Sequence, residues 1–273
     1  MRSNHRVEKA AEDAPLTQSV RPQLPGERSQ GSEIGHGGSH MKVIGLIGGV
    51  SWESSSEYYR LINQAVKSKL GALHSAELVM YSLDFEPIAR FEHDEHWDQL
   101  ATVLIAAARK LEVAGASFVL IASNTLHKVA PQVQAQLGIP LVHIADAVAE
   151  AVTRAGVSSV GLLGTRFVME QDFYRERLAG HGLKIAVPYK EARDFIHDVI
   201  YKELALGDIR ETSRRGVLEI IEELAKAGAV GIVLANTELP LLIRAEDSRA
   251  IVFDSMAVHV DKAVSLALAP EGV

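Results

Sequence analysis

The strongest constraint on the fold is a strand–helix alternation that runs through the chain twice. The apolar run KVIGLIGG at residues 42–49 is typical of a buried strand, and SSVGLLGTRF from residue 158 repeats it. SFVLIASNT from residue 117 is matched in the same way by GAVGIVLANTELPLL from residue 228. Gly48 precedes Asn124 by 76 residues, and Gly164 precedes Asn236 by 72. Parallel strands need crossovers of this length, so the sequence predicts two similar α/β halves.

Between these segments the apolar spacing predicts the remaining elements. A helix is expected up to Gly71 with Ser51 or Ser54 as its cap, and a long amphipathic helix over residues 97–115. Further helices are expected from Leu126, over 172–178 and over 212–228, with further strands at 76–84, 140–146 and 184–189. We expect parallel sheets with helices on both faces.

Composition excludes several classes of protein. The 273 residues are 47% hydrophobic and 23% charged, which is enough apolar material to build a core. A net charge of −7 argues against a nucleic-acid partner, and no apolar run reaches the roughly 18 residues of a membrane span. The chain has no cysteine, which excludes disulfides and thiol chemistry. We expect a cytoplasmic protein.

The first forty residues have a different composition from the rest. They carry five basic and five acidic residues, show no apolar period and end in GHGGSH before Met41. No apolar stretch typical of a signal peptide is present in them. We expect residues 1–40 to be a disordered tail or an expression tag, residues 41–150 to form one α/β domain, joined by the C-terminal helix, and residues 151–273 to form a second.

Polar residues gather directly after four of the expected strands. The four loops are 48–51, 123–125, 164–166 and 236–238. Ligands bind beyond the carboxyl ends of strands in sheets of this kind, so these loops are expected to face one cleft between the halves. Backbone N–H groups at the following helix starts would there bind a carboxylate or phosphate; ordinary helix capping is the alternative for any single loop.

Other site types find little support. Neither G-x-G-x-x-G nor a P-loop is present, which argues against a nucleotide cofactor. The cluster from His93 to His96 is better explained as a solvated loop than as a metal site. His127 follows the 123–125 loop and is a possible base, although a packing role is the alternative, and His259 is expected to pack in the core.

The motifs resemble the aspartate/glutamate racemase family, and most of all its bacterial L-aspartate/glutamate-specific racemases. The resemblance covers nearly all of residues 42–267 and is strongest in IGLIGGVSWESS, LGALHSAELV, SNTLHKVA, HIADA, LLGTRFVMEQDFYRERL and TELPLL. It implies two Rossmann-like domains related by pseudo-symmetry, an active site between them and an isomerase that works without pyridoxal phosphate or another cofactor. It also implies a homodimer and a small carboxylate or amino-acid ligand.

The resemblance places the catalytic positions in two of the loops. Family members usually carry a cysteine in each, and here Ser123 and Asn236 stand at those positions. By the same comparison, relatives supply a basic residue after the second strand, where Arg90 or His93 is the candidate here, and another that falls near Asp194-Phe195. The substrate-binding residues that we expect are Gly49, Val50, Ser51, Arg90, Asn124, Thr125, Thr165, Thr237 and Glu238.

The two substitutions matter because of the chemistry. Racemisation needs a base on one face of the α-carbon and an acid on the other. A serine hydroxyl needs an activating neighbour, and an asparagine neither gives up nor takes a proton. Three explanations stay open: replaced cysteines in an altered chain, a different reaction that uses Ser123 with His127 or Glu238, or binding of a small carboxylate without turnover. A lyase or isomerase acting on a related diacid is a further alternative.

Overall fold

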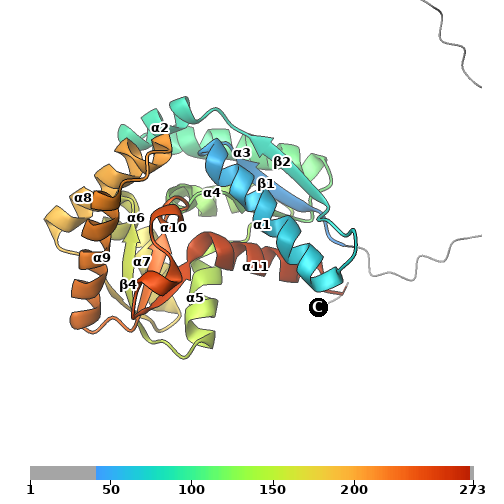
Figure 1. Ribbon diagram of the computed structural model, residues 1–273. Coiled ribbons are helices and arrows are strands. Elements are labelled where there is room, and N and C mark those ends of the chain that lie inside the picture. Colours follow the sequence, from blue (N-terminus) through green and yellow to red (C-terminus); the bar gives the residue numbers. More distant parts are fainter. Residues whose placement is uncertain (1–40, 271–273) are drawn as a thin grey trace, which may run out of the picture. The chain divides into compact units, whose positions relative to one another are not determined.

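Two parallel β-sheets form the framework of the protein (Figure 1). The computed structural model describes residues 41–270, so the expectation for residues 1–40 lies outside the described residues. The first sheet has the strand order β2-β1-β3 and the second the order β5-β4-β6-β7. The strands are β1 (Ile44–Gly48), β2 (Leu78–Ser82), β3 (Phe118–Ile121), β4 (Ser159–Gly164), β5 (Lys184–Ala186), β6 (Gly231–Ala235) and β7 (Ile251–Asp254).

Helices connect the strands and cover both faces of each sheet. The α-helices are α1 (Trp52–Leu70), α2 (Phe85–His93), α3 (Trp97–Val113), α4 (Ala130–Gln134), α5 (Ile144–Arg154), α6 (Arg166–Glu170), α7 (Asp172–Gly180), α8 (Lys190–Lys202), α9 (Glu211–Lys226), α10 (Leu239–Leu242) and α11 (Ser255–Ala267). The 3₁₀ turns are η1 (Thr125–Val129), η2 (Leu204–Leu206) and η3 (Ala245–Asp247). The expected α/β class with parallel sheets is therefore confirmed.

The central strand of the first sheet is buried along its whole length, as its unbroken apolar sequence predicts. Alternate residues of β1 point to opposite faces. Ile44 and Leu46 pack with α1 and α11 on one face, whereas Ile47 packs with α3 and α4 on the other. Gly45 is required beneath α3, because a Cβ there would lie 2.9 Å from Cβ of Ala116.

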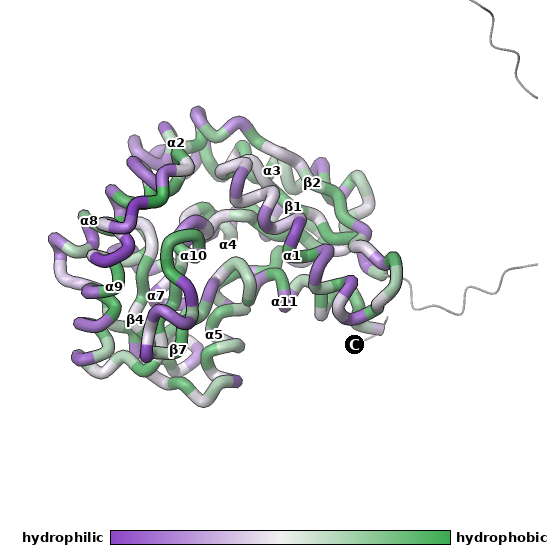
Figure 2. Tube along the Cα trace, in the orientation of Figure 1, coloured by the Kyte–Doolittle hydropathy of each residue, from purple (hydrophilic) through white to green (hydrophobic). Residues whose placement is uncertain are grey.

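The second sheet has the same layered arrangement. On one face, Leu163 of β4 and the side chains Ile232 and Leu234 of β6 pack with α8 and α9. On the other face, Val160 and Leu162 of β4 pack with α5 and α7. Figure 2 shows the same division, with apolar residues along the strands and hydrophilic residues on the outer turns of α8 and α9.

The last helix links the two sheets. It follows β7 of the second sheet, and its residues Met256, Val260 and Val264 pack in the core of the first sheet with α1 (Figure 1). Lys42 N donates a hydrogen bond to the Ala267 carbonyl at 2.9 Å, so the two ends of the described chain meet. The division into domains at residue 150 stays a prediction; that residue lies within α5.

The expected strand at 140–146 is wrong. Only Leu141 makes a β-bridge there, to Val119, and α5 begins already at Ile144. Pro140 has no N–H to donate to a ladder, and the His143 side chain accepts a hydrogen bond from Ala145 N as the cap of α5. Helix α2 and strand β7 are additions that the apolar pattern did not predict.

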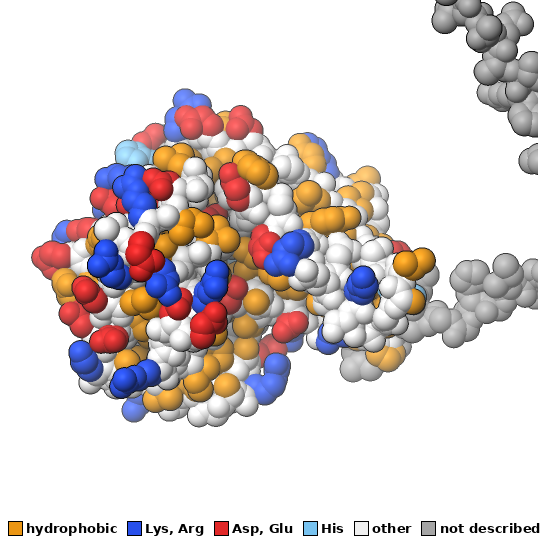
Figure 3. Space-filling view, in the orientation of Figure 1, with side chains coloured by type: hydrophobic (Ala, Val, Ile, Leu, Met, Phe, Trp, Pro, Cys, Tyr) orange, Lys and Arg blue, Asp and Glu red, His pale blue; other side chains and the backbone are white. Residues whose placement is uncertain are grey.

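Charged side chains of both signs are interspersed over the face drawn in Figure 3. Within residues 41–270, no helix combines the length and the apolar character needed to cross a bilayer.

Candidate functional site

One cleft collects residues from the carboxyl ends of strands in both sheets. Of the expected site residues, it is lined by Val50, Ser123, Asn124, Thr125, Thr165, Asn236, Thr237 and Glu238. The remaining lining residues are Phe85, Glu92, Ile200, Tyr201 and Ala205. The strand-end loops of the two halves therefore face each other, as the topology requires.

The loop at residues 123–125, called the first loop below, places a serine hydroxyl in this cleft. Ser123 is 9% exposed, and its Oγ accepts a weak hydrogen bond from Leu126 N at 3.4 Å. No acceptor for its hydroxyl proton lies within hydrogen-bond distance among the described residues. The hydroxyl is therefore free to donate to a ligand.

The neighbouring His127 holds the loop in place. Its Nδ1 lies 2.6 Å from the Ser123 carbonyl, and its Nε2 lies 3.2 Å from Ile144 N. Because the amide can only donate, Nε2 accepts and Nδ1–H donates, which fixes a neutral tautomer. Burial lowers the pKa of His127 well below its usual range, and the nearby rings of His143 and His259 lower it further. Neither ring nitrogen is left to act on a ligand.

Asn124 and Thr125 join the two halves of the molecule. Asn124 Oδ1 accepts from the Tyr174 hydroxyl at 3.0 Å, and its Nδ2 donates to Ser255 Oγ at 3.0 Å. The Thr125 hydroxyl is hydrogen-bonded to the Thr165 hydroxyl at 2.9 Å. These side chains are engaged with the protein itself, so their direct role at the cleft is to fix its shape.

Side chains of the loop at residues 236–238, called the second loop below, are hydrogen-bonded mainly to one another and to the backbone of the same segment. Asn236 Oδ1 accepts from the backbone N–H groups of Glu238 and Leu239 at 3.0 and 2.9 Å, and Asn236 Nδ2 donates to Glu238 Oε2 at 2.9 Å. The Thr237 hydroxyl donates to the same oxygen at 2.9 Å. Asn236 thus holds the turn before α10 through its Oδ1, and its Nδ2 donates to Glu238.

The expected anion site at the helix starts finds little support in this geometry. η1 has five residues and α10 has four, so neither carries much of a helix dipole. Asn236 already occupies the N–H groups of Glu238 and Leu239.

Ser51 joins the first sheet to this second loop. Its hydroxyl donates to Glu238 Oε1 at 3.0 Å, and Ser51 Oγ accepts from Ser54 N at the start of α1 at 3.3 Å. Gly49 makes the turn possible: its φ is 81°, and a Cβ there would lie 2.1 Å from the Leu83 carbonyl oxygen. Gly49 itself does not line the cleft. Burial raises the pKa of Glu238, against three side-chain donors that lower it.

Glu92 and Tyr201 are cleft residues that the sequence analysis missed. Glu92 is 2% exposed, and its Oε2 accepts from the Tyr201 hydroxyl at 3.1 Å. Burial raises the pKa of Glu92 to about 7; the Tyr201 hydrogen bond opposes the rise and the nearby Glu238 adds to it. The available signal was helical spacing, because Glu92 follows the buried Ile88 by four residues on α2.

The expected basic residue does not reach the cleft. Arg90 lies on α2 with its side chain 69% exposed and 3.6 Å from Glu86. It lines a neighbouring recess together with Arg166, His197 and Lys202. The side chain of Arg90 points away from the cleft because residues 90 and 92 lie on different faces of the helix.

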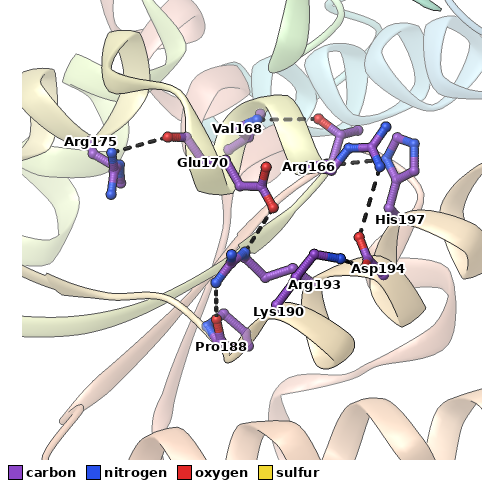
Figure 4. Close-up of polar contacts among 10 residues, drawn as sticks. Arg166, Val168, Glu170, Arg175, Pro188, Lys190, Arg193, Asp194 and His197 are labelled. Carbon is purple, nitrogen blue, oxygen red and sulfur yellow. Dashed lines mark hydrogen bonds and ion pairs between the residues drawn. The ribbon is translucent and has the colours of Figure 1, made fainter.

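Arg166 also lines the neighbouring recess and not the cleft, and Figure 4 shows it beside His197 and Asp194. Its backbone N–H donates to His197 Nδ1 at 3.2 Å, and its guanidinium lies 3.8 Å from Asp194. Asp194 also pairs with Lys190 at 2.6 Å. These basic side chains form ion pairs outside the cleft. Among the described residues, no lysine or arginine lines the cleft.

Comparison with known proteins decides the family. Residues 47–263 match the model of the Asp/Glu/hydantoin racemase family. The chain belongs to this family. A candidate Asp/Glu racemase from Yersinia pestis shares 45% identity with this racemase-family chain at a TM-score of 0.79, covering 84% of this chain and 100% of the other.

Two further relatives are informative. An aspartate racemase homologue from Pyrococcus horikoshii is 37% identical, with a TM-score of 0.74 and coverage of 84% and 100%. The broad specificity amino-acid racemase RacX of Bacillus subtilis is 22% identical over 232 residues, which are 83% of this chain and 99% of RacX. The racemase-family fold with two halves, expected from the sequence, is confirmed.

Proposed function

We propose that the cleft binds a small α-amino acid of the aspartate/glutamate type, and that Ser123 and Asn236 do not carry out the two-base racemisation typical of the family. The observation that carries this proposal is the charge pattern of the lining. Two buried carboxyl groups, Glu92 and Glu238, face hydroxyl groups, and no lysine or arginine joins them among the described residues.

This pattern favours a ligand that carries an ammonium group. A bare diacid would meet two carboxyl groups with no cation to offset the repulsion, whereas the ammonium of an amino acid is attracted to them. The free hydroxyl proton of Ser123 is available to the carboxylate of the same ligand. An amino acid therefore fits this lining better than a simple dicarboxylic acid.

The residues at the two cysteine positions argue against full racemisation. The Asn236 amide has no titrating proton, and its oxygen and nitrogen are held by the backbone and by Glu238. Ser123 lacks an activating base because both nitrogens of His127 are occupied. Binding of the amino acid, without inversion at ordinary enzymatic rates, is the function that this geometry supports.

The proposal extends to cofactor and assembly. Pyridoxal phosphate chemistry needs a lysine for its Schiff base, and no lysine lines the cleft among the described residues, which supports a cofactor-independent protein. A homodimer follows from the family resemblance, and light scattering at several concentrations tests it. A cytoplasmic location and the absence of a nucleic-acid partner stay predictions from the sequence.

Calorimetry tests the proposed function directly. L-Asp, L-Glu and their D-forms should bind, whereas succinate and glutarate, which keep both carboxylates but lack the ammonium, should bind at least about tenfold more weakly. Equal binding of succinate and L-Asp would contradict the role of the ammonium group. Rapid inversion of L-Asp or L-Glu by the unchanged protein would contradict the second half of the proposal.

A further inference from the structure

The two carboxyl groups of the cleft differ in how completely they are hydrogen-bonded. Glu238 accepts from three side chains, the Ser51 and Thr237 hydroxyls and the Asn236 amide. Glu92 accepts from one, the Tyr201 hydroxyl, and only at Oε2. A carboxylate that already accepts three hydrogen bonds is a poor base, because each of those bonds stabilises its charge. Glu92 Oε1 has no hydrogen-bond partner among the described residues.

The position of Glu92 gives it access to a ligand. It lines the same cleft as Ser123 and Asn236, although it comes from α2 and not from a strand-end loop. The Tyr201 hydroxyl fixes one oxygen of the carboxyl group from α8 on the opposite side. The other oxygen remains for a molecule bound in the cleft.

The surroundings of Glu92 suit proton transfer near neutral pH. The groups that face it are the Tyr201 hydroxyl from α8 and the Glu238 carboxyl from the second loop, and residues 41–270 place no cation in the cleft to oppose them. Arg90 and His93 of its own helix and Arg166 and His197 across from it line the neighbouring recess. A buried acid with a pKa of about 7 is close to the optimum for a general base in a neutral solution.

We propose that Glu92 is a catalytic acid–base residue that exchanges the α-hydrogen of the bound amino acid on one face, in place of the two missing thiols. This inference rests on the proposed function. The Cα–H bond breaks and the proton moves to Glu92 Oε1, while the bond's electron pair forms the C=C bond of an enediolate on the substrate carboxylate. The protonated Glu92 exchanges with solvent and returns a hydron to the same face, which regenerates the amino acid with its configuration retained.

Tyr201 is a positioning residue in this scheme. Its hydrogen bond holds the carboxyl group and lowers the pKa of Glu92 against the effect of burial. Replacing Tyr201 by Phe therefore shifts the alkaline rise of the exchange rate to higher pH, a change that a purely structural role would not produce.

The test is α-proton exchange of L-Asp and L-Glu in D₂O, followed by NMR, with calorimetry of the same samples. The unchanged protein should exchange the α-proton of a bound ligand, with a rate that rises through about pH 7. Glu92→Gln should lower the rate about 10²-fold or more, well beyond the loss of affinity that follows from removing one of the two cleft carboxyl groups. Glu92→Asp keeps the carboxyl group one methylene further back, so its rate should lie between the two.

Glu86→Gln is the matched control. Glu86 lies on the same helix but is exposed, and it pairs with Arg90 outside the cleft. Its exchange rate should equal that of the unchanged protein.

Three outcomes would overturn the inference. Exchange that persists within threefold in Glu92→Gln would show that another group removes the proton. A Glu92→Gln variant that loses affinity in proportion to rate would show that Glu92 holds the ammonium. Binding without any exchange in the unchanged protein would refute this inference alone, whereas no binding of either amino acid would refute the proposed function as well.

Discussion

The two strand-end loops occupy equivalent places in the two halves, but they use their side chains in opposite ways. In the first loop, Asn124 and Thr125 bond to distant residues on other elements, and the Ser123 hydroxyl proton is left free. In the second loop, Asn236 and Thr237 bond to the loop itself and to Glu238. The first loop therefore bonds mainly to other elements and presents a donor, whereas the second bonds mainly within itself and reaches the first sheet through the hydrogen bond from Ser51 to Glu238.

The difference explains why the two family positions are not equivalent here. The Ser123 side chain makes one weak hydrogen bond, to Leu126 N, so a change of this side chain affects mainly the cleft. Asn236 accepts hydrogen bonds from the backbone N–H groups of Glu238 and Leu239, so a change there disturbs both the cleft and the fold.

The largest expected effect comes from restoring both thiols. The double variant Ser123→Cys with Asn236→Cys should raise inversion of L-Asp or L-Glu by about 10²–10⁴-fold, because a thiol is readily tuned as an acid or base. Ser123→Cys alone should do little, and Asn236→Cys alone should give exchange before inversion, since the two groups act as a unit. Chiral chromatography of both substrates measures this. A double variant that stays folded and inert on both would mean that the ligand is not an acidic amino acid.

A change of pH tests the carboxyl group that α2 adds to the cleft beside the second loop. The pKa of Glu92, next to Glu238, is raised from 4.5 to about 7 in the folded protein. An acid whose pKa is higher in the folded state contributes its full stabilisation below about pH 4.5. This contribution is lost as the pH rises through about 7. Over that range Glu92 should reduce the free energy of unfolding by about 3 kcal/mol.

Urea unfolding at pH 5 and pH 8 checks this sign. Glu92→Gln should flatten the pH dependence and unfold at a higher urea concentration than the unchanged protein at pH 8. If the free energy of unfolding of Glu92→Gln depended on pH as steeply as that of the unchanged protein, the pKa of Glu92 would not be raised by folding.

A comparison of alanine variants tests the two loops directly. Asn236→Ala should lower the free energy of unfolding by about 2 kcal/mol, since it removes the acceptor of two backbone N–H groups and a donor to a buried carboxyl group. Ser123→Ala should cost less than about 0.5 kcal/mol, because it removes one weak hydrogen bond. Urea midpoints of both variants measure the difference. Equal losses would contradict the contrast between the loops.

A smaller effect than that of Asn236→Ala concerns the link between the halves. Tyr174→Phe removes the hydroxyl that donates to Asn124 and should cost about 1 kcal/mol. Ligand affinity should stay the same, because Tyr174 does not line the cleft. Thermal unfolding with and without L-Asp separates the two quantities. A loss of affinity larger than the loss of stability would show that Asn124 is a ligand contact.

The sequence predicts the parts of the site that follow from topology alone. Ser123 and Asn236 meet in one cleft because each follows a central parallel strand, and apolar runs locate such strands well. The rotation of a helix about its own axis is harder to predict from the sequence. Whether Arg90 or Glu92 faces the cleft depends on how α2 packs against its neighbours, and a nine-residue helix has too few turns to fix this from its pattern. The strand expected at 140–146 failed because capping by His143 outweighed its apolar content.

The return of α11 to the first sheet has a consequence for synthesis. Helices α1 and α11 cover the same face of β1, yet 184 residues separate the end of α1 from the start of α11. As a ribosome makes the chain, the second sheet is complete before the first has its last helix. Domains generally fold in order from the N-terminus, but here the N-terminal core closes last, once residues 255–267 have emerged. The core around β1 and α1 is therefore complete only when α11 packs against it.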